Sequence, residues 1–290
     1  MYELAMVGAA VMTAFSVLAN QKYQQFSGSG LGSAIRFALW SSVIGVVAAL
    51  AVQVGRVEFT WFSVLISLWA SVNGVIYTLF SLYALEKNNL TMYTTFSMLG
   101  GMLLPFLAGI LIWQEPLTWQ KGVCCLLLIF SIVCNVQLRG GSDVRKGLFY
   151  GLAVFFLNGL GGLINKIHQS YPDLAVDSGS YSIIFRAWIV LICLAVLLFN
   201  KQTPMLAIPE KKKRRSAWKS LLIYGVLALV SSWIYLVALL HVEASFTYVL
   251  ITGSVIVCTT LLSLILRERV TKRQIVSVVI AVLGMVCLAL

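Results

Sequence analysis

The chain has 290 residues, of which 60% are hydrophobic and only 11% are charged. So few charged residues could not cover the apolar surface of a soluble domain of this length, and the composition predicts an integral membrane protein. The formal net charge of +11 does not indicate nucleic-acid binding, because the longest basic run, residues 211–215, precedes an apolar segment, as cytoplasmic membrane anchors do.

Ten apolar segments of about 20 residues follow one another along the chain, and this is the length that a helix needs to cross roughly 30 Å of hydrocarbon. They lack the alternating pattern of β-barrel strands, and the short connections between them leave no room for a soluble domain. We therefore predict an all-α integral membrane protein with ten transmembrane helices. The predicted spans are 2–21, 34–54, 60–85, 91–113, 119–138, 147–167, 180–199, 217–240, 244–266 and 271–290.

The loops between these spans carry the signal for orientation. With the N-terminus outside, all but four of the 21 Lys and Arg residues fall on the cytoplasmic side. The four exceptions are Arg56, Lys121, Lys166 and Arg186. Because cytoplasmic loops are enriched in Lys and Arg, we expect a multi-pass protein of a bacterial-type plasma (inner) membrane with both termini extracytoplasmic.

The fourth span of each half is followed by a similar polar turn, QEPLTWQKG in the first half and RERVTKRQ in the second. Glu115 and Glu268 occupy corresponding positions in these turns, and Thr118 and Thr271 follow three residues later. Each threonine is placed to cap the helix that begins directly after it.

These landmarks predict two five-helix repeats, residues 1–139 and 140–290. An odd number of spans in each repeat means that the second copy enters the membrane from the opposite side. Inverted repeats of this kind are common in secondary transporters, because an exchange of conformation between the two copies opens a central site to alternate sides of the membrane.

The segments LIWQEPLTWQKG and LILRERVTKRQIVSVVIAVLGMV resemble the closing helices of the EamA-like transporter family, which belongs to the drug/metabolite transporter (DMT) superfamily. The family pattern is Glu, then Thr at plus three, Gln at plus six, and Gly at plus nine and plus sixteen. The second half carries Glu268, Thr271, Gln274, Ser277 and Gly284, and the first half carries Glu115, Thr118, Lys121, Cys124 and Ser131. The small residues in this pattern permit close contact between helices.

Polar side chains inside spans are costly unless they face a cavity or another helix, so they are the candidates for a binding site. The predicted substrate-binding residues are Asn73, Tyr77, Tyr93, Ser97, Asn158, Ser232, Tyr235, Tyr248 and Thr252. The resemblance implies that spans one, three, four, six, eight and nine line a central cavity. Alternatively, Ser and Thr bond their own helix, and Tyr belongs to the membrane interface. Asn73 and Asn158 rank first, because a buried amide must satisfy both donors and an acceptor.

Two basic residues, Lys166 and Arg186, flank the loop between spans six and seven and could attract a carboxylate or phosphate. For residues near span ends, extension of the charged group to the lipid headgroups is the expected alternative. His168 is expected to lie in the loop. Every acidic residue falls in a loop or near a span end, so no carboxylate is placed for proton-coupled export of an organic cation. This favours a neutral, zwitterionic or anionic substrate.

The sequence therefore predicts a secondary transporter that moves a small polar metabolite, such as an amino acid or nucleoside, by alternating access. A flippase or carrier for lipids or lipid precursors is the alternative, and a receptor or scaffold without flux is more remote. A membrane enzyme is disfavoured because both histidines, His168 and His241, lie at span ends. We expect no cofactor, metal or nucleic-acid partner. The expected partners are the small-molecule substrate and the lipid bilayer, and the expected state is a monomer or homodimer.

Glycines are concentrated in the fourth and sixth spans. The segments LGG at residues 99–101, GLFYG at 147–151 and NGLGG at 158–162 permit close approach of helix backbones. We interpret them as packing sites between spans of one chain, and the alternative is that they mark where a helix bends during transport.

Overall fold

The computed structural model describes residues 2–53, 57–112, 114, 118–135, 142–199, 211–239 and 244–289. Within these ranges the chain forms ten helices, and each overlaps one of the ten predicted spans. Their bounds are α1 Tyr2–Ser27, α2 Leu31–Gln53, α3 Trp61–Lys87, α4 Leu90–Leu111, α5 Trp119–Asn135, α6 Ser142–Gln169, α7 Ser178–Phe199, α8 Lys211–Leu239, α9 Ala244–Ile265 and α10 Lys272–Ala289.

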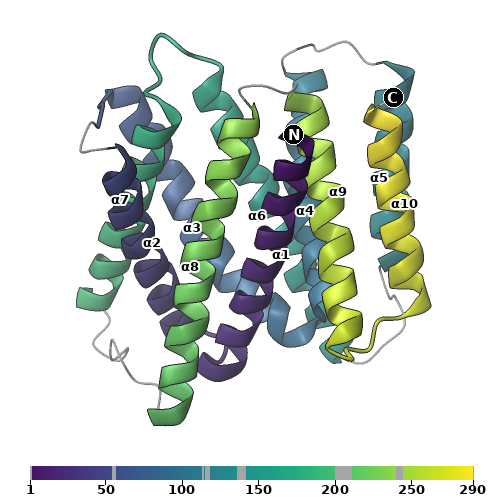
Figure 1. The fold of residues 1–290 in the computed structure, drawn as a ribbon, viewed down its shortest axis with the longest axis horizontal. Helices are drawn as coiled ribbons and strands as arrows, with labels where there is room; N and C mark the ends of the chain where they lie inside the picture. The colour runs from purple at the N-terminus through teal and green to yellow at the C-terminus, as the bar shows by residue number, and fades with distance from the viewer. Residues whose placement is uncertain are drawn as a thin grey trace.

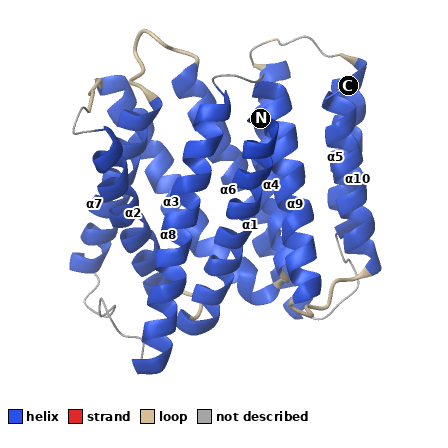
Figure 2. Cartoon of the chain, in the orientation of Figure 1, coloured by secondary structure: helices blue, strands red, loops and turns tan. Residues whose placement is uncertain are grey.

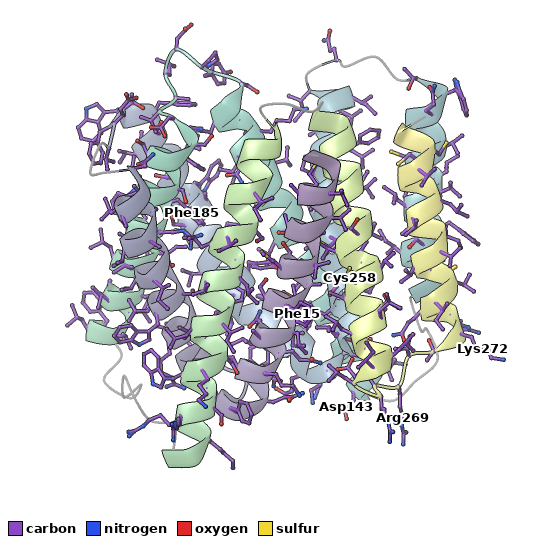
Figure 3. All side chains as sticks on the ribbon, in the orientation of Figure 1. Phe15, Asp143, Phe185, Cys258, Arg269 and Lys272 are labelled. Atoms are coloured by element: carbon purple, nitrogen blue, oxygen red, sulfur yellow. The ribbon has the colours of Figure 1, made fainter. Side chains whose placement is uncertain are left out.

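The helices lie side by side with alternating directions, so that α1 begins and α10 ends at the same end of the bundle (Figure 1). The described ranges contain no β-strand (Figure 2). Asp143, Arg269 and Lys272 lie together at the opposite end of the bundle from the two termini (Figure 3).

Judged on the described residues, six helices are long and apolar enough to cross a membrane, namely α1, α2, α3, α4, α6 and α7. Two shorter apolar segments, Gly122–Cys134 and Ile251–Ile265, belong to α5 and α9 in the described part of the chain. Many large apolar side chains are exposed on the outside of the bundle, including Leu126 and Leu283. Such a surface is stable in lipid and not in water.

The main contacts between the first five helices and the last five are symmetric. If α1–α5 are matched in order to α6–α10, each of these main contacts has a counterpart with the roles of the halves reversed. α1 packs against α8 and α9, and correspondingly α6 packs against α3 and α4. α2 packs against both α7 and α8, and α7 packs against both α2 and α3. The pairs α4–α9 and α5–α10 map onto themselves.

The pair α5–α10 is held by small residues of the closing motifs. Ser131 and Ser277 exchange hydrogen bonds across the two helices, with their hydroxyl oxygens 2.9 Å apart. Elsewhere along the same two helices, Gly284 of α10 lies against the backbone of α5. A Cβ at Gly284 would lie 3.5 Å from the Cys124 carbonyl oxygen. These are the plus-nine and plus-sixteen positions of the two halves, and their small side chains allow the helices to approach closely.

The spacing of Glu268, Thr271 and Gln274 has a local structural explanation. The Thr271 hydroxyl accepts from the Gln274 amide, and the Gln274 side chain accepts from the Thr271 amide, which together form a capping box for α10. The predicted N-cap at Thr271 is therefore confirmed. Glu268 accepts from the Leu90 amide at the start of α4, where a negative charge is favoured, and from the Ser263 hydroxyl of α9.

Glycines join α4 to α6 with almost no space between the backbones. A Cβ at Gly100 would collide with the carbonyl group of Phe155, and a Cβ at Gly159 would lie 2.6 Å from the Gly100 carbonyl oxygen. A Cβ at Gly162 would lie 2.7 Å from the Pro105 ring. The interpretation of these glycines as packing sites within one chain is confirmed, and they bring the two halves of the chain together.

Candidate functional site

A chain of hydrogen-bonded polar side chains runs through the interior of the bundle between α1, α3 and α4. The Tyr77 hydroxyl lies 3.1 Å from the Tyr93 hydroxyl and 2.9 Å from the Ser97 hydroxyl. The Ser81 hydroxyl lies 2.6 Å from that of Tyr93 and accepts from the Asn20 amide at 3.4 Å. Tyr77 and Ser81 are four residues apart, which places both on the face of α3 turned toward α4.

The two asparagines ranked first connect this network to the second half of the chain. Asn158 of α6 donates to the Ser97 carbonyl at 2.7 Å, and Asn73 of α3 donates to the Leu157 carbonyl at 2.9 Å. The glycines opposite them provide the space for these bonds, because a Cβ at Gly101 would lie 2.5 Å from the Asn158 amide nitrogen. Five of the predicted site residues, Asn73, Tyr77, Tyr93, Ser97 and Asn158, are thus brought to one interface of α3, α4 and α6.

Two acceptors at this interface have no hydrogen-bond partner among the described residues. The side-chain oxygens of Asn20 and Asn73 are buried, and neither accepts a hydrogen bond within the described part of the chain. Buried polar groups in native proteins are normally paired, and an unpaired one costs stability. These oxygens are therefore available to a donor on a molecule that enters the interface.

The remaining predicted residues are not joined to this network. Thr252 is buried in α9, and the described hydrogen bonds of Tyr77 go to Tyr93 and Ser97 and not to Thr252. The side chains of Ser232, Tyr235 and Tyr248 lie outside the described residues, as does Glu115. Sequence reasoning missed Asn20, although its position in an apolar span is the same signal that identified Asn73.

The two cationic candidates lie in different environments. Lys166 is three residues from the end of α6, at a depth where its amine can reach headgroups. Arg186 is eight residues inside α7, and Phe185 beside it lies well within the length of the bundle (Figure 3). Arg186 is half-buried, and a Cβ at Gly45 of α2 would collide with its guanidinium. The position expected for Arg186, near a span end, is therefore wrong.

His168 also differs from the expectation, because it lies in α6 and is buried. Its Nε2 atom is 2.9 Å from the Ser63 hydroxyl, and its ring centroid is 4.0 Å from that of Tyr181. The loop that was expected to begin before His168 begins after it, since α6 extends to Gln169. The histidine ties α6 to α3 and α7 at the end of the bundle where the termini lie.

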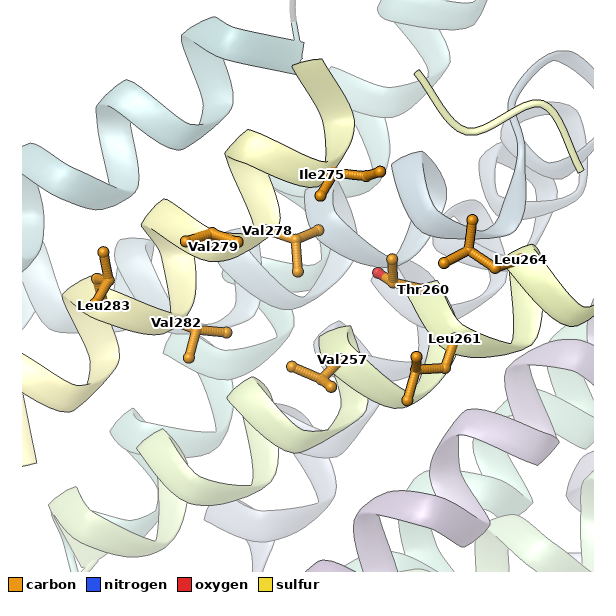
Figure 4. A pocket seen from close by; sticks show the side chains of 9 residues that line it. All are labelled: Val257, Thr260, Leu261, Leu264, Ile275, Val278, Val279, Val282 and Leu283. Atoms are coloured by element: carbon orange, nitrogen blue, oxygen red, sulfur yellow. The ribbon is translucent and has the colours of Figure 1, made fainter. Parts of the chain in front are cut away.

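A groove on the outside of the bundle is separate from this network. It has a volume of about 350 Å³ and is lined by apolar side chains of α9 and α10, with Thr260 as its one polar residue in the described part of the chain (Figure 4). Such a groove matches lipid chains, and it offers no group that could select a polar molecule.

The fold and the polar interface together define a multi-pass helical membrane protein. The sequence matches the EamA-like transporter family over residues 145–290, just over half of the chain. The chain therefore belongs to this family, and so to the DMT superfamily. The match covers the half that keeps more of the Glu, Thr and Gln spacing described above.

A solved structure described only as "Crystal structure of protein" is similar in fold, with a TM-score of 0.63 and 15% sequence identity. The similarity covers 99% of this chain and 94% of that chain. At this identity the likeness concerns the fold alone. No curated protein matches the chain.

Proposed function

We propose that this membrane transporter is a secondary carrier that moves a small polar metabolite by alternating access, and that its ten helices all cross the membrane as two inverted five-helix repeats. The exchange-related contacts between the two halves support the inverted arrangement. We place the protein in the plasma membrane, with the end of the bundle that carries Arg269 and Lys272 facing the cytoplasm. Both termini then lie outside the cell.

The observation that carries this proposal is the polar network at the seam between the halves, centred on Tyr77. Its members come from α1, α3 and α4 of the first half and α6 of the second. A change in the relative position of the halves would break the two bonds that join α6 to the first half, from Asn158 to the Ser97 carbonyl and from Asn73 to the Leu157 carbonyl. The amide oxygens of Asn20 and Asn73, which lack partners among the described residues, provide acceptors, and the hydroxyls of the network can donate or accept. This combination suits a small polar molecule.

The charges favour the same class of substrate. Each described acidic side chain, such as Glu86 and Asp143, lies within two residues of a helix end or in a connection. A carboxylate at mid-membrane depth would be needed to pair with an organic cation. The proposed substrate is therefore neutral, zwitterionic or anionic, and we propose that the chain acts as a carrier and not as an enzyme.

Flux into proteoliposomes tests this function. Purified protein would be reconstituted and supplied with radiolabelled amino acids, nucleosides and sugars, and uptake would be compared with protein-free vesicles. We expect saturable uptake of at least one compound, and at least about a tenfold loss of uptake in Tyr77→Phe, because a hydroxyl in contact with a buried polar substrate is costly to remove. Tyr171→Phe, at an exposed position, is the matched control. Uptake equal to that of empty vesicles for every class would contradict the proposal.

A further inference from the structure

Arg186 is a cation inside a membrane span for which the described part of the chain provides no anion. It lies eight residues after the start of α7 and thirteen before its end, or about 12 Å and about 20 Å along the helix axis. Its guanidinium has no hydrogen bond or ion pair among the described residues. An arginine at this depth is rare and costly, and it normally faces a cavity or pairs with an anion.

The direction of the side chain is set by the packing of α7. The neighbours of Arg186 in the chain face α3, because the Phe185 carbonyl accepts from Ser71 at 2.7 Å and Trp188 donates to the Val64 carbonyl at 3.2 Å. Arg186 itself lies against Gly45 of α2, where any larger residue would collide with the guanidinium. The glycine thus provides the space that the guanidinium occupies in the interior.

Tyr224 of α8 lies near the same part of α2. The two helices pack together, and the Tyr224 ring centroid is 4.7 Å from that of Phe37. Gly225, beside Tyr224, packs against Ile44, which precedes Gly45, and this contact places α8 level with Arg186. Tyr224 makes no hydrogen bond within the described residues. Within the described residues, a guanidinium without an anion and a hydroxyl without a hydrogen bond are therefore carried by α7 and α8 on either side of α2.

We propose that Arg186 binds an oxyanion of the transported molecule, a carboxylate or a phosphate, with Tyr224 beside it. This inference rests on the proposed carrier function and narrows its substrate to molecules that carry such a group. A guanidinium presents two parallel N–H donors that match a carboxylate or phosphate, and the bonds are strong because both partners are charged. The bound oxyanion supplies the negative charge that the described residues around Arg186 do not provide.

Thermal unfolding of the purified protein in detergent without anionic lipid tests this site independently of transport. Sodium acetate and inorganic phosphate would be titrated against sodium chloride at constant ionic strength. We expect a saturable rise in Tm with at least one oxyanion, because a ligand that binds only the folded state stabilises it. Arg186→Gln should abolish this rise or shift it to at least about tenfold higher concentration, and Arg186→Lys should retain part of it. Arg145→Gln, at an exposed position, removes the same charge and should behave as the wild type.

Gly45→Ala keeps the charge and displaces the guanidinium, so it supplies the test if Arg186→Gln does not fold. It should weaken the response to oxyanion without changing the response to chloride. No saturable shift in the wild type, or an equal shift in Arg186→Gln, would overturn the site. A shift produced by phosphatidylglycerol alone would mean that a lipid headgroup occupies the site, and would also overturn the assignment to substrate.

The flux assay separates this inference from the carrier function. Saturable uptake confined to compounds with a carboxylate or phosphate supports both. Uptake of uncharged sugars or nucleosides that is unaffected by Arg186→Gln would leave the carrier function intact and overturn the role of Arg186. An oxyanion shift that depends on Arg186, together with no flux of any compound, would support the binding site and contradict the carrier function.

Discussion

Gln114 and Arg267 share a left-handed backbone conformation, with φ of 53° and 56°, and each directly precedes the glutamate of its half. Among the described residues no other non-glycine has positive φ. After α9, this conformation lets the Arg267 amide bond the Leu264 carbonyl and the Glu268 amide bond the Ser263 carbonyl, which is a Schellman ending. A strained residue at the same place in both halves is expected if the halves are diverged copies.

This conformation predicts a contrast between two substitutions of Arg267. Arg267→Val should lower the free energy of unfolding by about 1–2 kcal/mol, because a β-branched residue is strained at positive φ. Arg267→Gly should be neutral or stabilising, since glycine adopts this conformation without strain. Thermal or denaturant unfolding in detergent would measure both. Arg269→Val, two residues further along, is the control and should change stability by less than about 0.5 kcal/mol. Equal losses for valine at the two positions would be inconsistent with the left-handed ending.

The Tyr77 and Ser97 hydroxyls predict a measurable coupling between α3 and α4. Each single substitution, Tyr77→Phe or Ser97→Ala, leaves a buried partner with one bond fewer and should cost about 1–2 kcal/mol of stability. The double variant should cost less than the sum of the two by about 0.5–1 kcal/mol, because it removes both partners of one bond. A double-mutant cycle of unfolding free energies would measure this coupling. Exact additivity would show that the two hydroxyls do not interact.

The helix order, the closing motifs and the polar face of α3 follow from local patterns, so they could be predicted from the sequence. Apolar runs gave each helix, and the Thr271 cap needs only its neighbour three residues on. The contact of Ser131 with Ser277 could be anticipated only as close packing, because the partner lies in the other half of the chain. Whether small residues hydrogen-bond across two helices depends on their rotation, which no local pattern specifies.

The errors at His168 and Arg186 have one physical origin. Both were placed by their distance from the apparent ends of apolar runs, yet α6 and α7 extend beyond those runs. His168 can be buried because Ser63 provides a partner, and Arg186 can lie inside because Gly45 leaves room. Both compensating residues are more than 100 positions away in the chain, so a reading of local hydropathy could not include them.

The glycine contact between α4 and α6 predicts strong sensitivity at Gly100. Gly100→Ala would force the added methyl into the Phe155 carbonyl, which is backbone and cannot rotate away. We expect a loss of about 1–3 kcal/mol from overpacking, and lower yield of folded protein. Gly8→Ala in α1 is the matched control, because a Cβ there meets nothing within 4 Å and alanine favours a helix by up to about 1 kcal/mol. Thermal unfolding of the two variants would test this contrast, and a Gly100→Ala protein as stable as Gly8→Ala would contradict the close approach.

Asp177 lies directly before α7, outside the spans, and its pKa makes the stability of the protein depend on pH. Partial burial raises the pKa of the Asp177 carboxyl, but hydrogen bonds from Ser180, Gly179 and Gln53 lower it more, and the net pKa falls below its usual 3.8. Because the folded-state pKa is depressed, the charged carboxylate stabilises the fold fully above the unfolded-state pKa. This contribution is lost as the pH falls through the folded-state pKa.

We therefore expect Asp177→Ala to lower stability by about 1 kcal/mol at neutral pH, as loss of an N-cap does. The difference in Tm between this variant and the wild type should stay constant from about pH 7 to pH 5 and narrow below about pH 4, where the wild-type carboxyl gains its proton. Asp173→Ala, in the same loop and exposed, should show no such narrowing. A difference that grows as the pH falls would mean that Asp177 is stabilised in its protonated form, and would exclude its role as a charged cap of α7.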